Sequence, residues 1–446
     1  MQQFNMEQKE EYKETELGFL PESWGVDNLE NEYIGFKNGL WKGKKEPFVK
    51  AKVLRNTNFK NDGTIRLNNI AELDVEEKQF KTREIINGDI ILERSGGGPA
   101  QPVGRVVFFD IEEGFNYSFS NFTSRIRVVN KEKIFSKYLF YFLLYFYMSG
   151  KTNDIQNRTT GIRNLDFSKY KQIYIPLPPL PEQKKIANVL SIIQEAKEKT
   201  ENVINSLKEL KKSMMKHLFT YGPVSLEEAE KVKLKDTEIG MVPEEWEVNN
   251  IGELYNVKQG KQISAKESKE GKIKKSFLRT SNLTWGKINI LKVDSMYFTK
   301  EKFGKLKLKK GDILTCEGGD IGRTAIYDDE LEECAYQNHL HRLRPKTSDT
   351  NNLFFVYWMN YAANQRKLYV FDANRTTIPN LSGSRLKNLK IPKPKLSEQQ
   401  QISSTLSAID TKIESEENKK NTLEELFKST LHNLMTAKIR VNELEI

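Results

Sequence analysis

A long helix that occurs twice constrains this chain more than any other feature. The first copy begins at Pro181 and runs to about Phe219, and the second begins at Ser397 and runs to about Met435. In each copy, apolar residues recur at alternating steps of three and four, which is the heptad spacing of a coiled coil. A helix of about 38 residues spans ~57 Å at ~1.5 Å per residue, so one globular core does not require it.

Both helices are expected to bury their apolar positions along a seam. The predicted seam consists of Ile186, Val189, Ile193, Val203, Leu207 and Leu210 in the first helix and Leu406, Ile409, Ile413 and Leu423 in the second. The middle of the second helix is polar at Glu416, Glu417 and Lys420. Such charges indicate either a solvated stretch or a face for a partner.

The helix belongs to a longer internal repeat, with a period of about 220 residues. Four motifs return in order: Glu-x-Gly-x-x-Pro-x-x-Trp at 16–24 and 238–246, Gly-Asp-Ile at 88–90 and 311–313, Asn-Arg-Thr-Thr at 157–160 and 374–377, and Pro-x-Leu-x-Glu-Gln at 178–183 and 394–399. The chain is therefore two repeats, each a globular part followed by a long helix.

The globular parts combine strand and helix patterns. Turn residues at 87–89 lead into the apolar run 90–92, which is typical of a strand. The apolar runs 138–147 and 353–361 predict short buried helices. We expect an α+β fold with two mixed α/β domains. The predicted divisions are domain 15–178, helix 179–221, linker 222–236, domain 237–394 and helix 395–437.

The overall charge favours an anionic partner. The formal net charge is +10, so nucleic acid is the first candidate, followed by an acidic protein or a membrane surface. The most apolar run, 134–148, is too short to cross a bilayer comfortably and predicts a core helix. The first 16 residues carry no apolar signal core, and two cysteines imply no disulfide framework. A reducing cytoplasm is the expected compartment.

The chain shows no motif for catalysis. It lacks GxxxxGK[ST], HExxH, GxSxG, the adenine-methylation motif [NDS]PP[YF] and a clear PD…[DE]xK nuclease cluster. The glycines at 96–98 and 318–319 predict tight loops between strands. Such loops can lie near DNA, because glycine lets backbone N–H groups approach a ligand. Asp89 and Asp312 stand at turn positions, where aspartate usually bonds to the backbone. We therefore predict no catalytic residue.

A metal site would need Cys316, Cys334, His339 and His341, since two histidines two apart share one face of a strand. The positions equivalent to the histidines in the first repeat are Phe122 and Ser124. Metal binding is therefore not a shared activity of the repeats, and we predict no metal.

Basic and polar residues in predicted loops favour DNA binding. The candidates are Lys37, Arg55, Asn58, Arg94, Arg158, Thr159 and Thr160 in the first repeat, and Lys258, Lys261, Arg279, Asn282, Arg323, Arg375, Thr376 and Thr377 in the second. Arginine can bridge guanine, asparagine can pair with adenine, and lysine and threonine suit phosphates. Repeated positions can equally hold the fold, in which case residues that read bases should differ between the repeats.

Taken together, the motifs and their period resemble the specificity subunit of type I restriction–modification systems. The resemblance covers residues from about Thr15 to Met435. It implies two target recognition domains, a proximal and a distal spacer helix that pair as an antiparallel coiled coil, and a bipartite DNA target whose spacer the helices set. It also implies a non-catalytic chain that binds double-stranded DNA.

The same resemblance implies partner subunits. Two modification (methyltransferase) subunits would use S-adenosylmethionine to methylate adenine, and restriction (endonuclease and translocase) subunits would use ATP and Mg²⁺. This chain would hold none of these cofactors. As a hypothesis, the outward helix faces, with Lys208, Lys211, Lys212 and Lys216, dock the modification subunits. The alternatives are a coiled-coil scaffold without sequence-specific DNA binding and a standalone enzyme, which the missing motifs disfavour.

Overall fold

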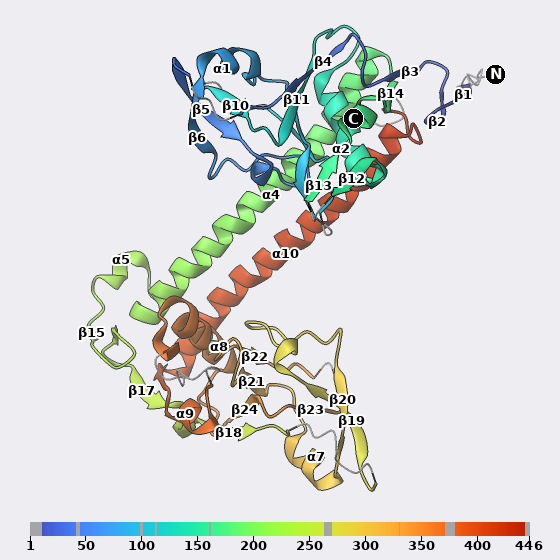
Figure 1. Ribbon diagram of the computed structural model, residues 1–446. Coiled ribbons are helices and arrows are strands. Elements are labelled where there is room, and N and C mark those ends of the chain that lie inside the picture. Colours follow the sequence, from blue (N-terminus) through green and yellow to red (C-terminus); the bar gives the residue numbers. More distant parts are fainter. Residues whose placement is uncertain are drawn as a thin grey trace, which may run out of the picture. The chain divides into compact units, whose positions relative to one another are not determined.

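The structure is a computed structural model that describes residues 11–41, 45–98, 101–111, 114–159, 162–262, 270–329, 331–370 and 380–441 (Figure 1). The chain divides into two compact units. Unit 1 contains Met1–Thr200 and Lys419–Ile446, whereas unit 2 contains the continuous stretch Glu201–Asn418. Each unit therefore holds one globular part and a segment of both long helices.

Unit 1 is organised around a four-stranded antiparallel sheet. Its strands lie in the order β4 (Ile34–Asn38), β11 (Thr123–Val128), β7 (Ile90–Glu93) and β9 (Val106–Phe108). A second sheet has the order β10 (Tyr117–Phe119), β5 (Phe48–Leu54) and β6 (Ala71–Glu76).

Strand β7 explains how the core of unit 1 forms. All four of its residues are buried, because core clusters cover both sides of the strand. Ile90 and Leu92 share one cluster with helix α2 (Ser136–Met148), while Ile91 joins the other. Side chains alternate between the faces of a strand, so a continuous apolar run is what a strand covered on both faces requires.

Unit 2 repeats this arrangement. Its four-stranded sheet has the order β18 (Tyr255–Gln259), β24 (Leu340–Pro345), β21 (Ile313–Cys316) and β22 (Thr324–Ile326), and its three-stranded sheet has β20 (Asp294–Phe298), β19 (Ile273–Leu278) and β23 (Cys334–Tyr336). Helix α8 (Asn352–Asn360) shares a core with Ile313, whereas Leu314 joins a separate core. The two predicted buried helices are thus present as α2 and α8.

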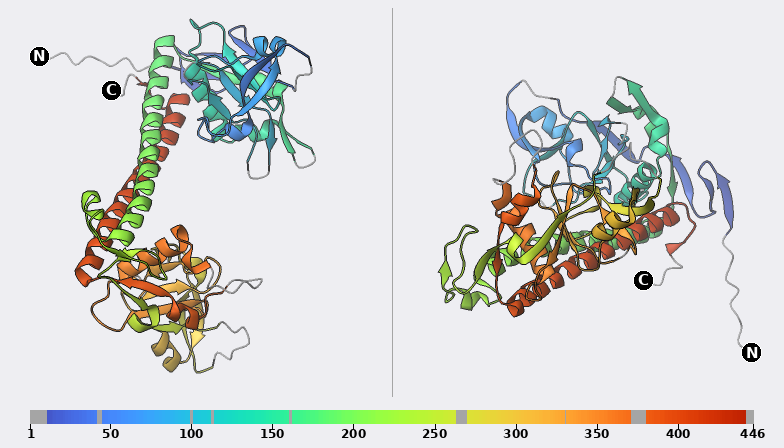
Figure 2. Two further views of the ribbon diagram at one scale, coloured as in Figure 1. Left: turned by 90° about the vertical axis from the view of Figure 1, so that its left-hand side faces the viewer. Right: turned by 90° about the horizontal axis from the view of Figure 1, so that it is seen from below.

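The long helices are α4 (Leu180–Tyr221) and α10 (Leu396–Met435). Within unit 1, the Lys197 ammonium lies 5.6 Å from the Phe427 ring, and Ile186 and Leu190 share a core with Leu434. Within unit 2, Lys208 and Lys211 pair with Glu417 and Asp410 at 2.8 and 2.6 Å. Residue numbers rise along one helix as they fall along the other, which confirms the antiparallel pairing (Figure 2).

The buried seam departs from the predicted one in the middle of α4. Val203 and Leu210 are 42% and 46% exposed, so the prediction is wrong for both residues. Ile204, 5% exposed, is buried instead, and Lys211 turns toward Asp410. The buried positions in this part of α4 are therefore shifted by one residue, and the buried face of the helix also carries the polar residues Lys197 and Thr200.

The other predicted seam residues are at least half-buried. Ile186, Leu406 and Ile413 are fully buried, whereas Val189, Ile193, Leu207, Ile409 and Leu423 are half-buried. The polar middle of α10 takes part in intrachain pairs: Glu416 is buried and pairs with Lys412 at 2.6 Å.

A repeated hydrogen-bond pattern joins each long helix to its globular part; we call it the helix root. In unit 1 the Trp24 indole donates to Glu182 at 3.1 Å, and the Gln183 amide bonds the backbone of Phe135 at 2.8 Å. In unit 2 Trp246 donates to Glu398 at 3.3 Å, and Gln399 bonds the backbone of Asn351 at 2.7 Å. The tryptophan motif and the Glu-Gln motif therefore recur together because they touch.

Helix α2 contains most of the apolar run 134–148. Within the described part of the chain, neither this helix nor any other is long and apolar enough to cross a membrane. The helix serves as core, since eight of its residues are buried.

Candidate nucleic-acid interface

A polar group of residues lies at the end of the four-stranded sheet in unit 1; we call it the amide cluster of unit 1. It consists of Asn38, Arg94, Phe122 and Ser124. Arg94 Nη1 donates to Asn38 Oδ1 at 2.7 Å, and Ser124 Oγ donates to the same oxygen at 3.1 Å. The backbone N–H of Arg94 donates to the Phe122 carbonyl at 2.8 Å, while the Phe122 side chain is 51% exposed.

Unit 2 holds an amide cluster of different chemistry at the equivalent positions. It consists of Gln259, Glu317, His339 and His341. Gln259 Nε2 donates to Glu317 Oε2 at 3.0 Å and to the Asn338 carbonyl at 3.0 Å. The backbone N–H of Glu317 donates to the His339 carbonyl at 2.9 Å, as Arg94 does to Phe122.

The environment shifts the pKa of two members. Burial lowers the pKa of His341 from its ordinary 6.5, and the nearby Glu317 carboxylate opposes this. The ring is therefore neutral at neutral pH, and its Nε2 donates to the Leu381 carbonyl at 3.1 Å. Burial also lowers the pKa of Arg94, which is still protonated at neutral pH and stacks 4.4 Å from the Phe167 ring.

Both histidines lie near the Glu317 carboxylate. Its Oε2 atom is 4.0 Å from His339 Nδ1 and 3.9 Å from His341 Nε2. Over the described ranges, no three His, Cys, Asp or Glu residues are placed to share an ion.

Each amide cluster adjoins a glycine that permits close backbone contact. A Cβ on Gly39 would lie 1.9 Å from the Ser120 carbonyl oxygen, and one on Gly260 would lie 2.2 Å from that of Gln337. No side chain fits at either glycine. The ends of β4 and β18 therefore pack directly against the backbone that precedes β11 and β24, respectively.

Leu165 and Leu381, which follow the two Asn-Arg-Thr-Thr motifs in the sequence, are bonded to the same strand ends. In unit 1, β12 (Gln156–Thr159) pairs with β13 (Ile162–Leu165), and the Leu165 N–H donates to the Arg94 carbonyl at 2.8 Å. In unit 2 the Leu381 N–H donates to the Glu317 carbonyl at 2.7 Å. Arg158 and Thr159 have described backbone in β12, whereas their side chains and all of Thr160, Arg375, Thr376 and Thr377 lie outside the described residues.

Two predicted DNA contacts, Asn58 and Asn282, are buried inside short 3₁₀ turns. The Asn58 amide oxygen accepts the Arg55 backbone N–H at 3.0 Å, and that of Asn282 accepts the Arg279 N–H at 2.9 Å. These side chains are 3% and 5% exposed, so the structure places them away from any surface ligand. They shape the turns that carry Arg55 and Arg279, both exposed.

Arg323 also holds a turn. Its Nη2 donates to the Thr280 carbonyl at 2.8 Å, and its Nη1 pairs with Asp320 at 3.0 Å. The equivalent Arg105 is buried against Glu93 at 2.6 Å and donates to the Asn56 carbonyl at 3.1 Å. Lys261 is likewise interior: it is 4% exposed and donates to the Tyr297 carbonyl at 2.8 Å.

Basic residues face one another across the first two strands of each four-stranded sheet. Lys37 lies opposite Arg125, and in the same register exposed Lys258 lies opposite Arg342, which is buried. Burial, followed by the charges of Arg342, Lys305 and Arg344, lowers the pKa of Lys258. Such a concentration of positive charge favours an anionic ligand.

The structure confirms the backbone role of the turn aspartates. Asp89 accepts the Ile86 N–H at 2.8 Å, and Asp312 accepts the Lys309 N–H at 2.8 Å. Sequence reasoning missed that each also pairs with an arginine, Arg127 in unit 1 and Arg344 in unit 2. In each unit a second arginine stands two residues earlier on the same strand, Arg125 in β11 and Arg342 in β24. The spacing alone could not tell which arginine of each pair bonds the aspartate.

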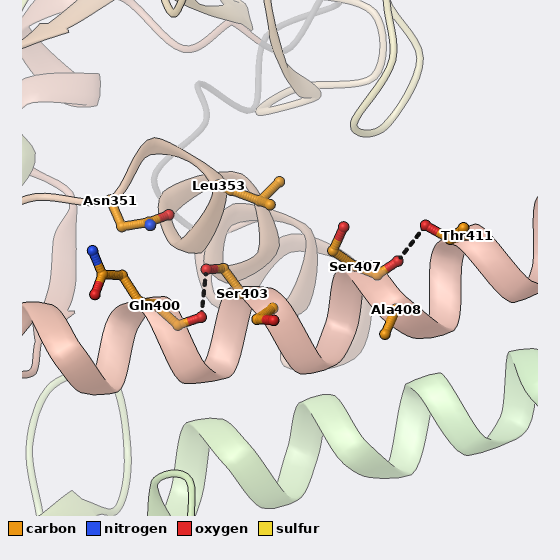
Figure 3. A pocket seen from close by; sticks show the side chains of 8 residues that line it. Asn351, Leu353, Gln400, Ser403, Ser407, Ala408 and Thr411 are labelled. Carbon is orange, nitrogen blue, oxygen red and sulfur yellow. Dashed lines mark hydrogen bonds between the residues drawn. The ribbon is translucent and has the colours of Figure 1, made fainter.

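A hollow of about 460 Å³ lies along α10 in unit 2 (Figure 3). It is lined by Asn351, Leu353, Gln400, Ser403, Ser404, Ser407, Ala408 and Thr411. The Ser403 and Thr411 hydroxyls donate back to the helix backbone at 3.1 and 3.0 Å. With no ionisable side chain in its lining, the hollow offers a small-residue helix face and no acid–base chemistry.

The fold and the repeat can now be set beside known proteins. The family model for the type I restriction modification DNA specificity domain matches residues 25–209 and again 243–425. The chain belongs to this family. The two matches correspond to the two repeats, so each copy of globular part and helix is one specificity domain.

Similar proteins span the same length. A type I restriction enzyme MjaVIII specificity subunit of Methanocaldococcus jannaschii is 32% identical over 72% of this chain and 75% of its own. The MjaIX specificity subunit of the same organism is 25% identical over 97% and 98%. The crystal structure of a type I restriction–modification S subunit from M. genitalium covers 92% of this chain and 96% of its own, with TM-score 0.55 and 18% identity, and supports the fold.

Proposed function

We propose that this chain reads a bipartite DNA target, one half-site for each specificity domain, and thereby directs adenine methylation and restriction by partner subunits. The observation that carries the proposal is the repetition of one strand-end scaffold with different chemistry in its two amide clusters. A protein that reads two different half-sites needs one fold twice and two different sets of polar groups. A scaffold without a DNA role needs neither.

Within this proposal the predicted basic and polar residues divide into two groups. Direct DNA contacts are assigned to the other predicted residues, Lys37, Arg55, Arg94, Arg158, Thr159, Thr160, Lys258, Arg279, Arg375, Thr376 and Thr377. Asn58, Lys261, Asn282 and Arg323 instead position the loops that carry them, since their polar atoms bond the backbone. We retain 15–178 and 237–394 as the two recognition domains.

The partners in this proposal are double-stranded DNA, two modification subunits and restriction subunits, acting together in the cytoplasm. S-adenosylmethionine, ATP and Mg²⁺ belong to those subunits. Of the four lysines in the docking hypothesis, Lys208 and Lys211 pair with Glu417 and Asp410, and Lys212 pairs with Glu209. Lys208, Lys212 and Lys216 are exposed, so a partner can reach these three.

The test is to co-express this chain with its modification subunit in a methylation-free host and to map modified adenines across the genome. We expect a split motif that is methylated only when this chain is present. A stable complex that produces no split motif would contradict the proposal, and no sequence preference with shallow salt dependence would favour the scaffold alternative.

The helices should act as a ruler. Inserting one heptad after Thr200 and another after Asn418 lengthens both by about 10.5 Å at ~1.5 Å per residue, or about three base pairs at ~3.4 Å each. The mapped spacer should lengthen accordingly while both half-sites keep their sequences. A change in the half-sites, with the spacer unaltered, would show that the helices do not set the distance.

A further inference from the structure

The two amide clusters differ in a way that bears on what each domain reads. We propose that the charge at residue 94 in unit 1 and residue 317 in unit 2 decides which end of a neighbouring amide is presented to DNA. Unit 1 then offers a hydrogen-bond donor and unit 2 an acceptor at the equivalent point. This inference rests on the proposed function and names specificity-determining residues within it.

In unit 1 the arginine fixes the amide with its NH₂ group outward. A guanidinium can only donate, so the atom of Asn38 that faces Arg94 Nη1 at 2.7 Å must be the oxygen. Ser124 Oγ donates to the same oxygen at 3.1 Å. Asn38 is exposed, and no bond to its Nδ2 is found within the described part of unit 1. The donor end therefore remains for a ligand.

In unit 2 the glutamate fixes the amide the other way round. A carboxylate only accepts, so Gln259 turns Nε2 toward Glu317 Oε2 at 3.0 Å. The same NH₂ group donates to the Asn338 carbonyl at 3.0 Å. Because both of these partners can only accept, they fix the orientation of the Gln259 side-chain amide. Gln259 is exposed, and its Oε1 bonds to nothing within the described part of unit 2.

The two amides occupy equivalent positions in the two units, so they differ in the end that they expose and not in their location. Asn38 lies opposite Ser124 across the β4–β11 pair, and Gln259 lies opposite His341 across the β18–β24 pair. Each amide is followed by the glycine that fixes the strand end. Glutamine is one methylene longer, yet the backbone around it is bonded in the same pattern in both units.

Opposite ends of an amide read opposite base edges. In the major groove an NH₂ group can donate to guanine O6 or N7, to adenine N7 or to thymine O4. A carbonyl oxygen can instead accept from adenine N6 or cytosine N4. Unit 1 should therefore require an acceptor at one base of its half-site, and unit 2 should require an exocyclic amino group at one base of its own.

The decisive variant is Asn38→Asp, tested as the full chain in complex with its modification subunit by the genome-wide methylation map. An aspartate can still pair with Arg94, so the cluster keeps its structure while the free donor becomes an acceptor. We expect about a tenfold change in base preference at one position of one half-site, the scale of a lost base contact. The second half-site should not change. Asn61→Asp, an equal charge change at another exposed asparagine of unit 1, should leave both half-sites unaltered.

A second variant tests the residue that orients the amide. Glu317→Gln can present either end to Gln259, so preference should relax at one position of the other half-site only. The inference is overturned if Asn38→Asp leaves both half-sites unchanged in a complex that still methylates, or if it alters both alike. A wild-type complex that yields no split motif would refute the proposed function itself, before any variant is compared.

Discussion

Unit 1 and unit 2 share their framework and differ in the residues attached to it. The tryptophan–glutamate bond of the helix root, the asparagine inside the 3₁₀ turn and the arginine that holds this turn are present in both. The amide clusters keep the backbone bonds but exchange arginine for glutamate and phenylalanine for histidine. The recurring residues whose polar atoms are bonded inside the fold therefore maintain it, and base-specific recognition should be sought where the copies diverge.

The helix roots also differ, and this provides the largest predicted effect. In unit 1 Glu182 bonds Trp24 and, in addition, pairs with buried Arg440 at 2.7 Å. In unit 2 Glu398 bonds Trp246, and no basic side chain within the described residues is found paired with it. The same glutamate thus balances a buried charge in one unit only.

Glu182→Ala should destabilise unit 1 by about 4 kcal/mol, because it removes both charged hydrogen bonds to buried Arg440 as well as the bond to Trp24. Glu398→Ala should cost unit 2 only about 1 kcal/mol, the net value of an ordinary hydrogen bond. Hydrogen exchange of the whole chain in increasing urea, read separately in peptides that report on each unit, measures both losses of stability. Equal losses would show that Arg440 contributes nothing to the root.

The turn arginines allow a second contrast of the same kind. Arg105→Met would leave Glu93, which is 0% exposed, without its partner, and we expect unit 1 to lose about 3 kcal/mol. Arg323→Met would leave Asp320, whose side chain is 72% exposed, in water, and unit 2 should lose about 1 kcal/mol. The same denaturation experiment reports both values, and a larger loss in unit 2 would contradict the assignment.

The smallest expected effect is a different pH dependence of the two units. Burial lowers the folded-state pKa of His341 below 6.5. The stabilisation of unit 2 by the neutral ring is therefore complete above about pH 6.5 and is lost as the pH falls below that value. In unit 1, burial raises the pKa of Asp62, but Lys197 and Thr64 lower it below 3.8 overall. Its contribution is therefore lost only in stronger acid.

Urea midpoints measured between about pH 7 and about pH 5 should therefore fall more for unit 2 than for unit 1. His341→Ser, which copies Ser124 of unit 1, should remove the part of this fall that comes from the histidine. If the fall in unit 2 is the same in the variant, His341 is not its source.

Repeats and heptads revealed the architecture from the sequence, because motif spacing and hydrophobic period are properties of the chain itself. The two long helices and the helices α2 and α8 were predicted in this way, whereas the antiparallel pairing was implied by the family resemblance. The inward turn of Lys211 and the exposure of Val203 were not, because a polar residue on a heptad face finds its partner only in three dimensions.

The candidate site was predictable in location but not in detail. Arg94 was identified as a basic loop residue, whereas Asn38 and Gln259 were missed because an isolated amide carries no sequence signal. Asn58 and Asn282 were placed at the interface because their chemistry suits adenine. Burial removed them from it, since the turn that each one closes needs the same atoms.

The pairing of Glu182 with Arg440, 258 residues apart, has a consequence for synthesis on the ribosome. Unit 2 is a continuous stretch, so it can complete its contacts while translation is still under way. Unit 1 begins first but needs the helix segment after residue 418 and Arg440 to complete its core and its buried ion pair. Its first 200 residues must therefore keep apolar surface uncovered until these later residues have been synthesised, which exposes unit 1 to misassociation for longer than unit 2.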